Sequence, residues 1–102
     1  MNIELIKAPS TSFLEMILDN IRPRDRKKLE DIKWGAVGLV QAKLIDLYWA
    51  TDASEKASNV KTALVMGSCP QHIQMLAIFG KQADVKTALD KIREVHSKLK
   101  SL

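Results

Sequence analysis

The sequence predicts a single α+β domain in which helices pack against an antiparallel sheet. The chain has 102 residues, the size of one domain, and 46% of them are apolar and 27% charged, as in ordinary globular proteins. Segments with helical and with strand-like patterns follow one another, separated by turn residues. These observations exclude a disordered chain and predict one domain over residues 1–102.

The N-terminal part is expected to form a strand and then a helix. Residues 2–7 contain three closely spaced apolar residues and stop before a proline, as a short strand does. Ser12 and Glu15 have the spacing of a capping box, which predicts a helix over residues 13–21. A proline two residues later ends that helix, and the charged stretch 24–32 fits either a short helix or a loop.

The rest of the chain predicts strand, helix, strand, strand and helix. Gly35 and Gly38 are costly within the first of these strands unless another backbone approaches closely. If the elements are rotated around the chain ends, they give the β-α-β-β-α-β set of a ferredoxin-like unit. We expect the strands over 33–41, 60–66 and 73–79, the last two as a hairpin, and the helices over 43–58 and 85–99, the latter capped by Asp84.

Charge and hydropathy argue against nucleic-acid and membrane partners. The net charge is +4, but acidic residues interrupt both basic clusters, at 22–28 and 91–100, which is typical of solvated helix surfaces. Aromatic residues are only 5% of the chain, so no stacking platform is evident. No apolar run approaches the roughly 18 residues of a membrane span, and no secretory signal is evident. A single cysteine agrees with a reducing cytoplasm.

Several segments resemble bacterial microcompartment shell proteins. They are G-A-V-G-L-V at 35–40, A-T-D-A-S-E-K-A-S-N-V at 50–60, and Phe79-Gly80 with Asp84-Val85 before the last helix. A strand and a helix precede this region instead of following it, which resembles the circularly permuted members of the family. The resemblance implies a circularly permuted, ferredoxin-like shell domain without catalytic activity. It also implies homohexamers that tile with other shell proteins into a shell in the bacterial cytoplasm.

The resemblance assigns a role to the loop between the last two strands, because this loop lines the hexamer's central pore in the family. G-S-C-P at 67–70 resembles the loop of the divergent shell protein of glycyl-radical propanediol microcompartments, whose cysteine is associated with an iron–sulfur cluster. The implied function is electron transfer across the shell by a [4Fe–4S] cluster shared between subunits. The implied cofactor-binding residues are Gly67, Ser68, Cys69 and Pro70, with Cys69 as the metal ligand.

Ligand chemistry constrains what Cys69 can do. An iron–sulfur cluster takes about four thiolates, and a chain with one cysteine supplies four only when several copies meet at one axis. Pro70 would stiffen the loop, and Gly67 is expected to adopt a positive φ. The alternatives are a small thiol-dependent redox enzyme or sensor in which His72 assists Cys69, and a thiol without a special role. His96 is interpreted as structural.

Overall fold

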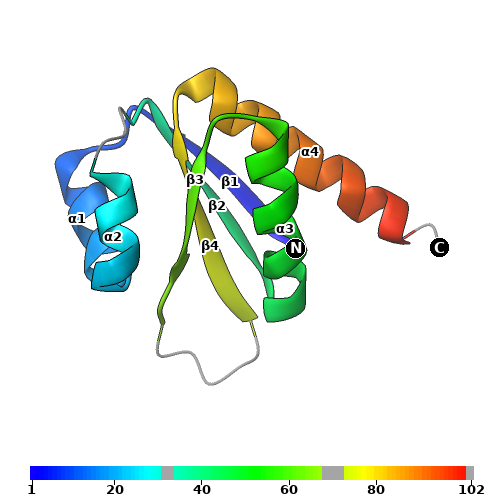
Figure 1. The fold of residues 1–102 in the computed structure, drawn as a ribbon, viewed down its shortest axis with the longest axis horizontal. Coiled ribbons are helices and arrows are strands. Elements are labelled where there is room, and N and C mark those ends of the chain that lie inside the picture. The colour runs from blue at the N-terminus through cyan, green and yellow to red at the C-terminus, as the bar shows by residue number, and fades with distance from the viewer. Residues whose placement is uncertain (31–33, 68–72, 101–102) are drawn as a thin grey trace.

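The structure is a computed structural model that describes residues 1–30, 34–67 and 73–100. It confirms the α+β class, the predicted strands and the helical option for the charged stretch after the first helix. Figure 1 shows the elements in chain order. They are β1 (Asn2–Lys7), α1 (Thr11–Asp19), α2 (Pro23–Leu29), β2 (Ala36–Lys43), α3 (Leu44–Ala57), β3 (Lys61–Val65), β4 (Ile73–Gly80) and α4 (Gln82–Lys100).

The four strands form one antiparallel sheet in the order β1-β2-β4-β3. Consecutive strands β3 and β4 pair as the expected hairpin, while β1 returns to pair with β2, so that Ile3 lies opposite Val40. The N-terminal strand is therefore part of the main sheet, and β1 and β3 are its two edges.

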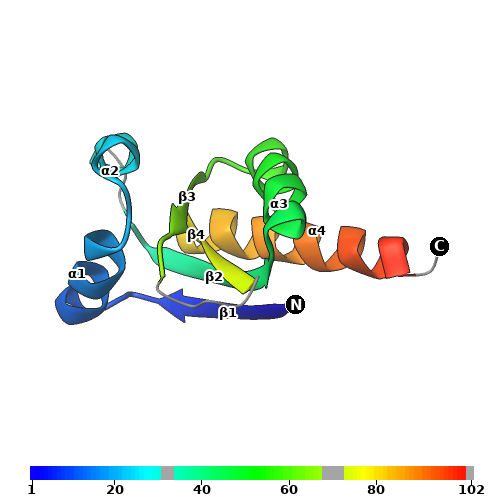
Figure 2. The ribbon, with the colours of Figure 1, turned by 90° about the horizontal axis from the view of Figure 1, so that it is seen from below.

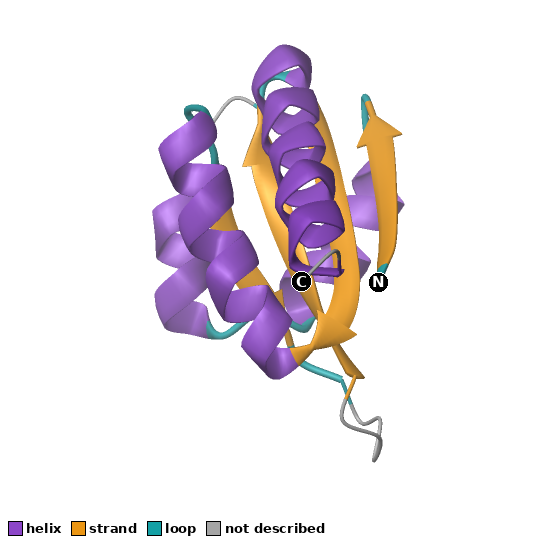
Figure 3. Ribbon diagram, turned by 90° about the vertical axis from the view of Figure 1, so that its right-hand side faces the viewer, coloured by secondary structure: helices purple, strands orange, loops and turns teal. Residues whose placement is uncertain are grey.

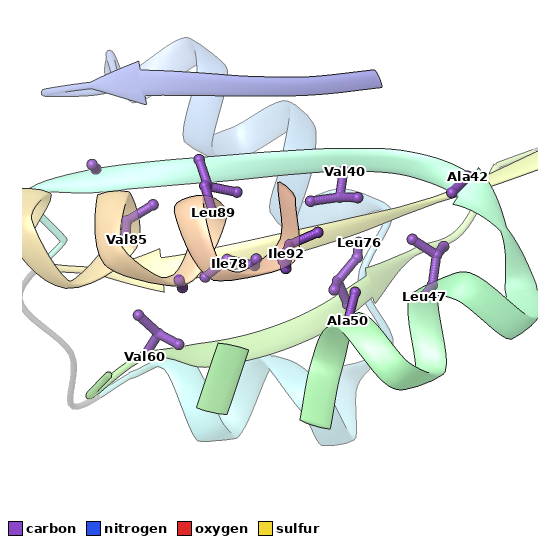
Figure 4. Packing of buried hydrophobic residues seen from close by; sticks show 12 residues of the cluster. Val40, Ala42, Leu47, Ala50, Val60, Leu76, Ile78, Val85, Leu89 and Ile92 are labelled. Atoms are coloured by element: carbon purple, nitrogen blue, oxygen red, sulfur yellow. The ribbon is translucent and has the colours of Figure 1, made fainter. Parts of the chain in front are cut away.

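One face of the sheet is covered by α3 and α4. Figure 3 shows α4, which leads to the marked C-terminus, lying along the sheet with α3 beside it. Figure 4 shows apolar side chains of both helices and of the strands filling the space between these layers. The buried residues are Ala36, Val40, Ala42, Leu47, Ala50, Val60, Leu76, Ile78, Val85, Ala88, Leu89 and Ile92.

The two glycines near the start of β2 allow α4 to approach closely. At Gly35, an added Cβ would lie 3.1 Å from the backbone nitrogen of Gln82, as the expected backbone approach requires. At Gly38 the neighbours are side chains instead: the Cβ would lie 3.0 Å from Leu89 Cδ2 and 3.1 Å from Val85 Cγ1. The cost of glycine in this strand is thus offset by tight helix packing.

Gly38→Val is expected to destabilise the domain, because its branched side chain would overlap Leu89 and Val85. Overpacking of this kind costs about 1–3 kcal/mol, which corresponds to a fall in melting temperature of roughly 5–15 °C for a domain of this size. Gln41→Val is the matched control, since Gln41 is exposed on the same strand. Equal melting temperatures for the two variants in thermal denaturation would contradict the close packing.

The opposite face of the sheet is covered only in part, by α1 and α2, which lie together at one end of the molecule (Figure 2). Here the indole of Trp34 lies 5.1 Å from the Phe79 ring, centroid to centroid. α1 has no buried residue and packs through half-buried apolar side chains. The buried residues of this second core are Ile21, Leu29, Val37, Ala63, Ala77 and Phe79.

Two predicted helix starts are wrong. The side chain of Ser10, not Ser12, caps α1: Ser10 is extended (φ −71°, ψ 160°) and its Oγ accepts a bond from the Phe13 N–H at 3.2 Å. α4 begins at Gln82, because the Lys81 carbonyl already accepts from the Val85 N–H at 2.9 Å. Asp84 therefore lies in the first turn, where its carboxylate interacts favourably with the helix dipole.

Candidate functional site

The candidate pore loop joins β3 to β4. Of its predicted site residues, Gly67 is described, whereas Ser68, Cys69 and Pro70 lie outside the described residues, as does His72. The structure therefore places the two strands that carry the loop. Figure 1 shows their ends together at one end of the sheet.

The two arms of the hairpin are held differently. The last pair between β3 and β4 is Val65 with Met75. β4 reaches two residues further toward the loop and pairs there with β2, where Gln74 lies opposite Ala42. The β4 arm is thus supported by its ladder with β2 close to the loop.

The β3 arm is held by α1. The Met66 N–H donates to the backbone carbonyl of Asn20 at 2.6 Å. Asn20 is the C-cap residue of α1, and its side-chain Nδ2 donates to the Met16 carbonyl at 2.9 Å. Carbonyls at a helix C-terminus lack partners within the helix, so the bond satisfies such a group and fixes the residue that precedes Gly67.

Gly67 does not have the expected backbone conformation. None of the described glycines has a positive φ, and a Cβ on Gly67 would meet no atom of its own chain within 4 Å. The expectation of a positive φ at this position was therefore wrong.

The described part of one chain does not hold a metal by itself. Across residues 1–30, 34–67 and 73–100, no three His, Cys, Asp or Glu side chains are grouped so that they could bind a metal ion. The whole chain has one cysteine. Because an iron–sulfur cluster needs about four thiolates, the donor set fits such a cluster only in an assembly of several copies.

His96 contacts α3 through an aromatic side chain. Its ring stacks on the indole of Trp49, with 6.5 Å between centroids and an angle of 14° between planes. The Trp49 Nε1–H in turn donates to Asp46 Oδ1 at 3.0 Å. This contact joins α4 to α3 on the helical side of the sheet.

The basic residues of α4 form a solvated, ion-paired surface, as their spacing indicated. Lys98 Nζ lies 3.0 Å from Glu94 Oε1, and Lys91 Nζ lies 3.7 Å from the same oxygen. The hydrogen bond from Lys98 and then the nearby charge of Lys91 lower the pKa of Glu94 below its ordinary value. These cations are partnered within their own helix and do not form a free anion-binding patch.

No sequence pattern predicts the groove along the outer edge of β3. It has a volume of about 560 Å³ and runs between α2 and α3. Its lining includes Arg22, Arg24 and Lys28 from the α2 side and Tyr48, Thr51 and Glu55 from α3. Residues from four separate segments form it, so only the folded chain reveals it.

Comparison with known proteins identifies the class of fold. No family model and no curated protein matches the chain. Solved structures do match, and the fold is that of microcompartment shell proteins. These neighbours are structural proteins and not enzymes, which supports a structural shell role and gives no support to a thiol-dependent enzyme.

Two of these structures are ligand-free GrpU microcompartment shell proteins. The one from Pectobacterium wasabiae is 28% identical, with a TM-score of 0.77, and the match covers 90% of this chain and 99% of that one. The one from Clostridiales bacterium 1_7_47FAA is also 28% identical, with a TM-score of 0.68, and the match covers 94% and 95% of the two chains. The likeness therefore extends over nearly the whole of each protein.

No helix among the described residues is long and apolar enough to cross a membrane.

Proposed function

We propose that the chain is a structural shell protein of a bacterial microcompartment in the bacterial cytoplasm. The observation that carries this proposal is the fold match over 90% of this chain and 99% of a GrpU shell protein. In the proposed shell, copies of the chain form homohexamers that pack beside other shell proteins. The N-terminal position of β1 within the main sheet supports a circularly permuted form of the shell domain.

The proposed hexamer brings six copies of loop 67–72 to one axis, where Cys69 thiolates from different subunits bind a [4Fe–4S] cluster. One cysteine per chain is too few for a cluster, whereas a ring of six chains provides enough. A bound cluster would supply one-electron transfer across the shell. The bond from Met66 to Asn20 supports this function, because it fixes the strand that leads into the loop.

Assembly is the first consequence to test. The anaerobically purified protein is expected to have six times the 11.4 kDa chain mass in native mass spectrometry and light scattering. It should be brown, and iron and sulfide analysis should give one [4Fe–4S] cluster per hexamer. A monomer across a wide range of protein concentrations would contradict the shell proposal, whereas a colourless hexamer would contradict the cluster alone.

A further inference from the structure

The residues that line the groove between α2 and α3 have no role in the proposed cluster site. We propose that it binds an acidic, extended peptide segment of another protein, which adds a strand to the outer edge of β3. This inference concerns a partner of the folded domain. The groove lies on one folded chain, and the proposal does not require the cluster at the loop.

The outer edge of β3 is unpaired among the described residues. The Met66 N–H points to Asn20, away from β4. Because backbone groups alternate in direction along a strand, the N–H and C=O groups of Thr62 and Leu64 point the same way. No backbone group in the described part of the chain bonds to them. Such an edge is a template for an added strand.

The surroundings of this edge form a groove of suitable shape. α2 and α3 lie on opposite faces of the sheet, with the edge strand β3 between them (Figure 1). The resulting groove of about 560 Å³ falls within the roughly 300–1,000 Å³ of common ligand sites. β3 has five residues, so the groove matches a peptide segment of about that length lying alongside it.

The groove carries an excess of positive charge. Four cationic residues line the groove, against two carboxylates, Asp25 and Glu55. Both carboxylates already have partners: Asp25 Oδ1 lies 3.4 Å from Lys28 Nζ, and Glu55 Oε2 accepts a bond from Thr62 Oγ1 at 2.7 Å. The acidic side chains of the groove are therefore engaged within the chain.

The remaining cations are not engaged in this way. Arg22, Arg24 and Lys61 make no ion pair with the described residues. Arg22 and Arg24 belong to the α2 side, and Lys61 is the first residue of β3. The groove thus offers three cations to an occupant on the α2 side, and charge complementarity selects acidic side chains there.

The α3 side selects apolar side chains. Tyr48 is 63% exposed on α3, and Leu64 is half-buried beside it in the groove lining. Successive side chains of a strand point to opposite faces. An added strand would therefore direct every second residue toward α2 and the others toward Tyr48. The matching occupant alternates acidic and apolar residues.

The chain itself does not provide such a segment. Its C-terminal residues 98–102 read K-L-K-S-L and are basic, β1 carries one Glu and one Lys, and the net charge is +4. A second copy would bring more positive charge to a basic groove. The partner of the groove is accordingly a different protein with an acidic extended segment.

Fluorescence anisotropy with a labelled peptide, Glu-Val-Glu-Val-Glu-Val-Glu, tests the proposal on the purified, assembled protein. Two control peptides replace the central Val by Pro, which blocks strand pairing but keeps the charge, or every Glu by Gln. We expect the first peptide to bind and each control to bind at least about tenfold more weakly, since each loses one of the two modes of recognition. If the proline peptide bound equally well, charge attraction alone would account for binding, and the proposal would be overturned.

Protein variants locate the peptide. Arg24→Gln combined with Lys61→Gln should weaken binding about tenfold. The matched control is Lys86→Gln combined with Lys98→Gln, which removes two exposed cations of α4 and should leave binding unchanged. Equal losses in both double variants would overturn the assignment to the groove.

Thr62→Pro tests strand addition. It removes an outward N–H that the ladder with β4 does not use, and proline is tolerated at such edge positions. We expect loss of peptide binding with an unchanged circular dichroism spectrum and native mass. A changed native mass would instead identify the groove as a contact between copies of this chain and overturn the proposal. If this variant fails to fold, the peptide series and the charge variants still test the proposal.

Discussion

Cys69→Ser is expected to abolish the visible absorbance of the anaerobically purified protein and to leave its oligomeric state unchanged. Because Cys69 is the chain's one cysteine, the variant contains no thiolate at all. A serine hydroxyl is hardly ionised at neutral pH and is a hard ligand, so it does not replace thiolate on iron. Serine is nearly isosteric with cysteine, so folding should persist.

Absorbance spectra, iron and sulfide analysis and native mass, measured together, decide this prediction. His72→Gln is the matched control, since it changes a neighbouring loop residue and should retain the cluster. Full iron content in Cys69→Ser would show that the metal is bound elsewhere. Loss of both the colour and the hexamer would show that the cluster holds the subunits together, which would make electron transfer the weaker interpretation.

Deletion of residues 1–21 is expected to unfold the domain. The deletion removes the edge strand β1, all of α1 and the carbonyl that anchors Met66. It also removes apolar side chains whose burial contributes on the order of 10 kcal/mol, comparable with the whole stability of a typical domain. The half-buried or buried apolar side chains lost are Ile3, Leu5, Ile6, Phe13, Leu14, Ile17, Leu18 and Ile21.

Circular dichroism and size-exclusion chromatography of the truncated chain provide the measurement. The control is Met16→Ala combined with Glu15→Ala, because both side chains lie on the exposed surface of α1 and should be dispensable. A truncated chain that still melts cooperatively and keeps its native mass would show that the N-terminal segment is an accessory to a core that folds without it.

The periodicity of apolar residues predicted the sheet well, but the helix starts less well. Residues 10–12 read S-T-S, and either serine could cap the helix. Only the extended backbone of Ser10 in the folded chain shows that Ser10 is the cap. Asp84 likewise fits both a cap and a first-turn position, and the bond from Val85 to the Lys81 carbonyl decides it. Local composition identifies the region of a helix start, whereas tertiary packing fixes the residue.

The candidate site was predictable only as a stretch of sequence. The hairpin of two apolar strands was predicted correctly, because the turn residues between the strands are contiguous in the sequence. The hydrogen bond from the Met66 N–H to the Asn20 carbonyl joins segments far apart in the chain, and no spacing in the sequence indicates it. The same holds for the groove, whose cations belong to α2 and β3 and whose tyrosine belongs to α3.

The bond between Met66 and Asn20 has a dynamic consequence. α1 buries no residue completely, and elements with little buried apolar surface open locally at a lower free energy than the core does. Each opening of α1 withdraws the Asn20 carbonyl and frees the β3 arm, while the ladder between β2 and β4 stays intact. Local opening of an N-terminal helix is thereby coupled to the strand that precedes Cys69. Any neighbouring molecule that holds α1 in place also slows the motion of that arm.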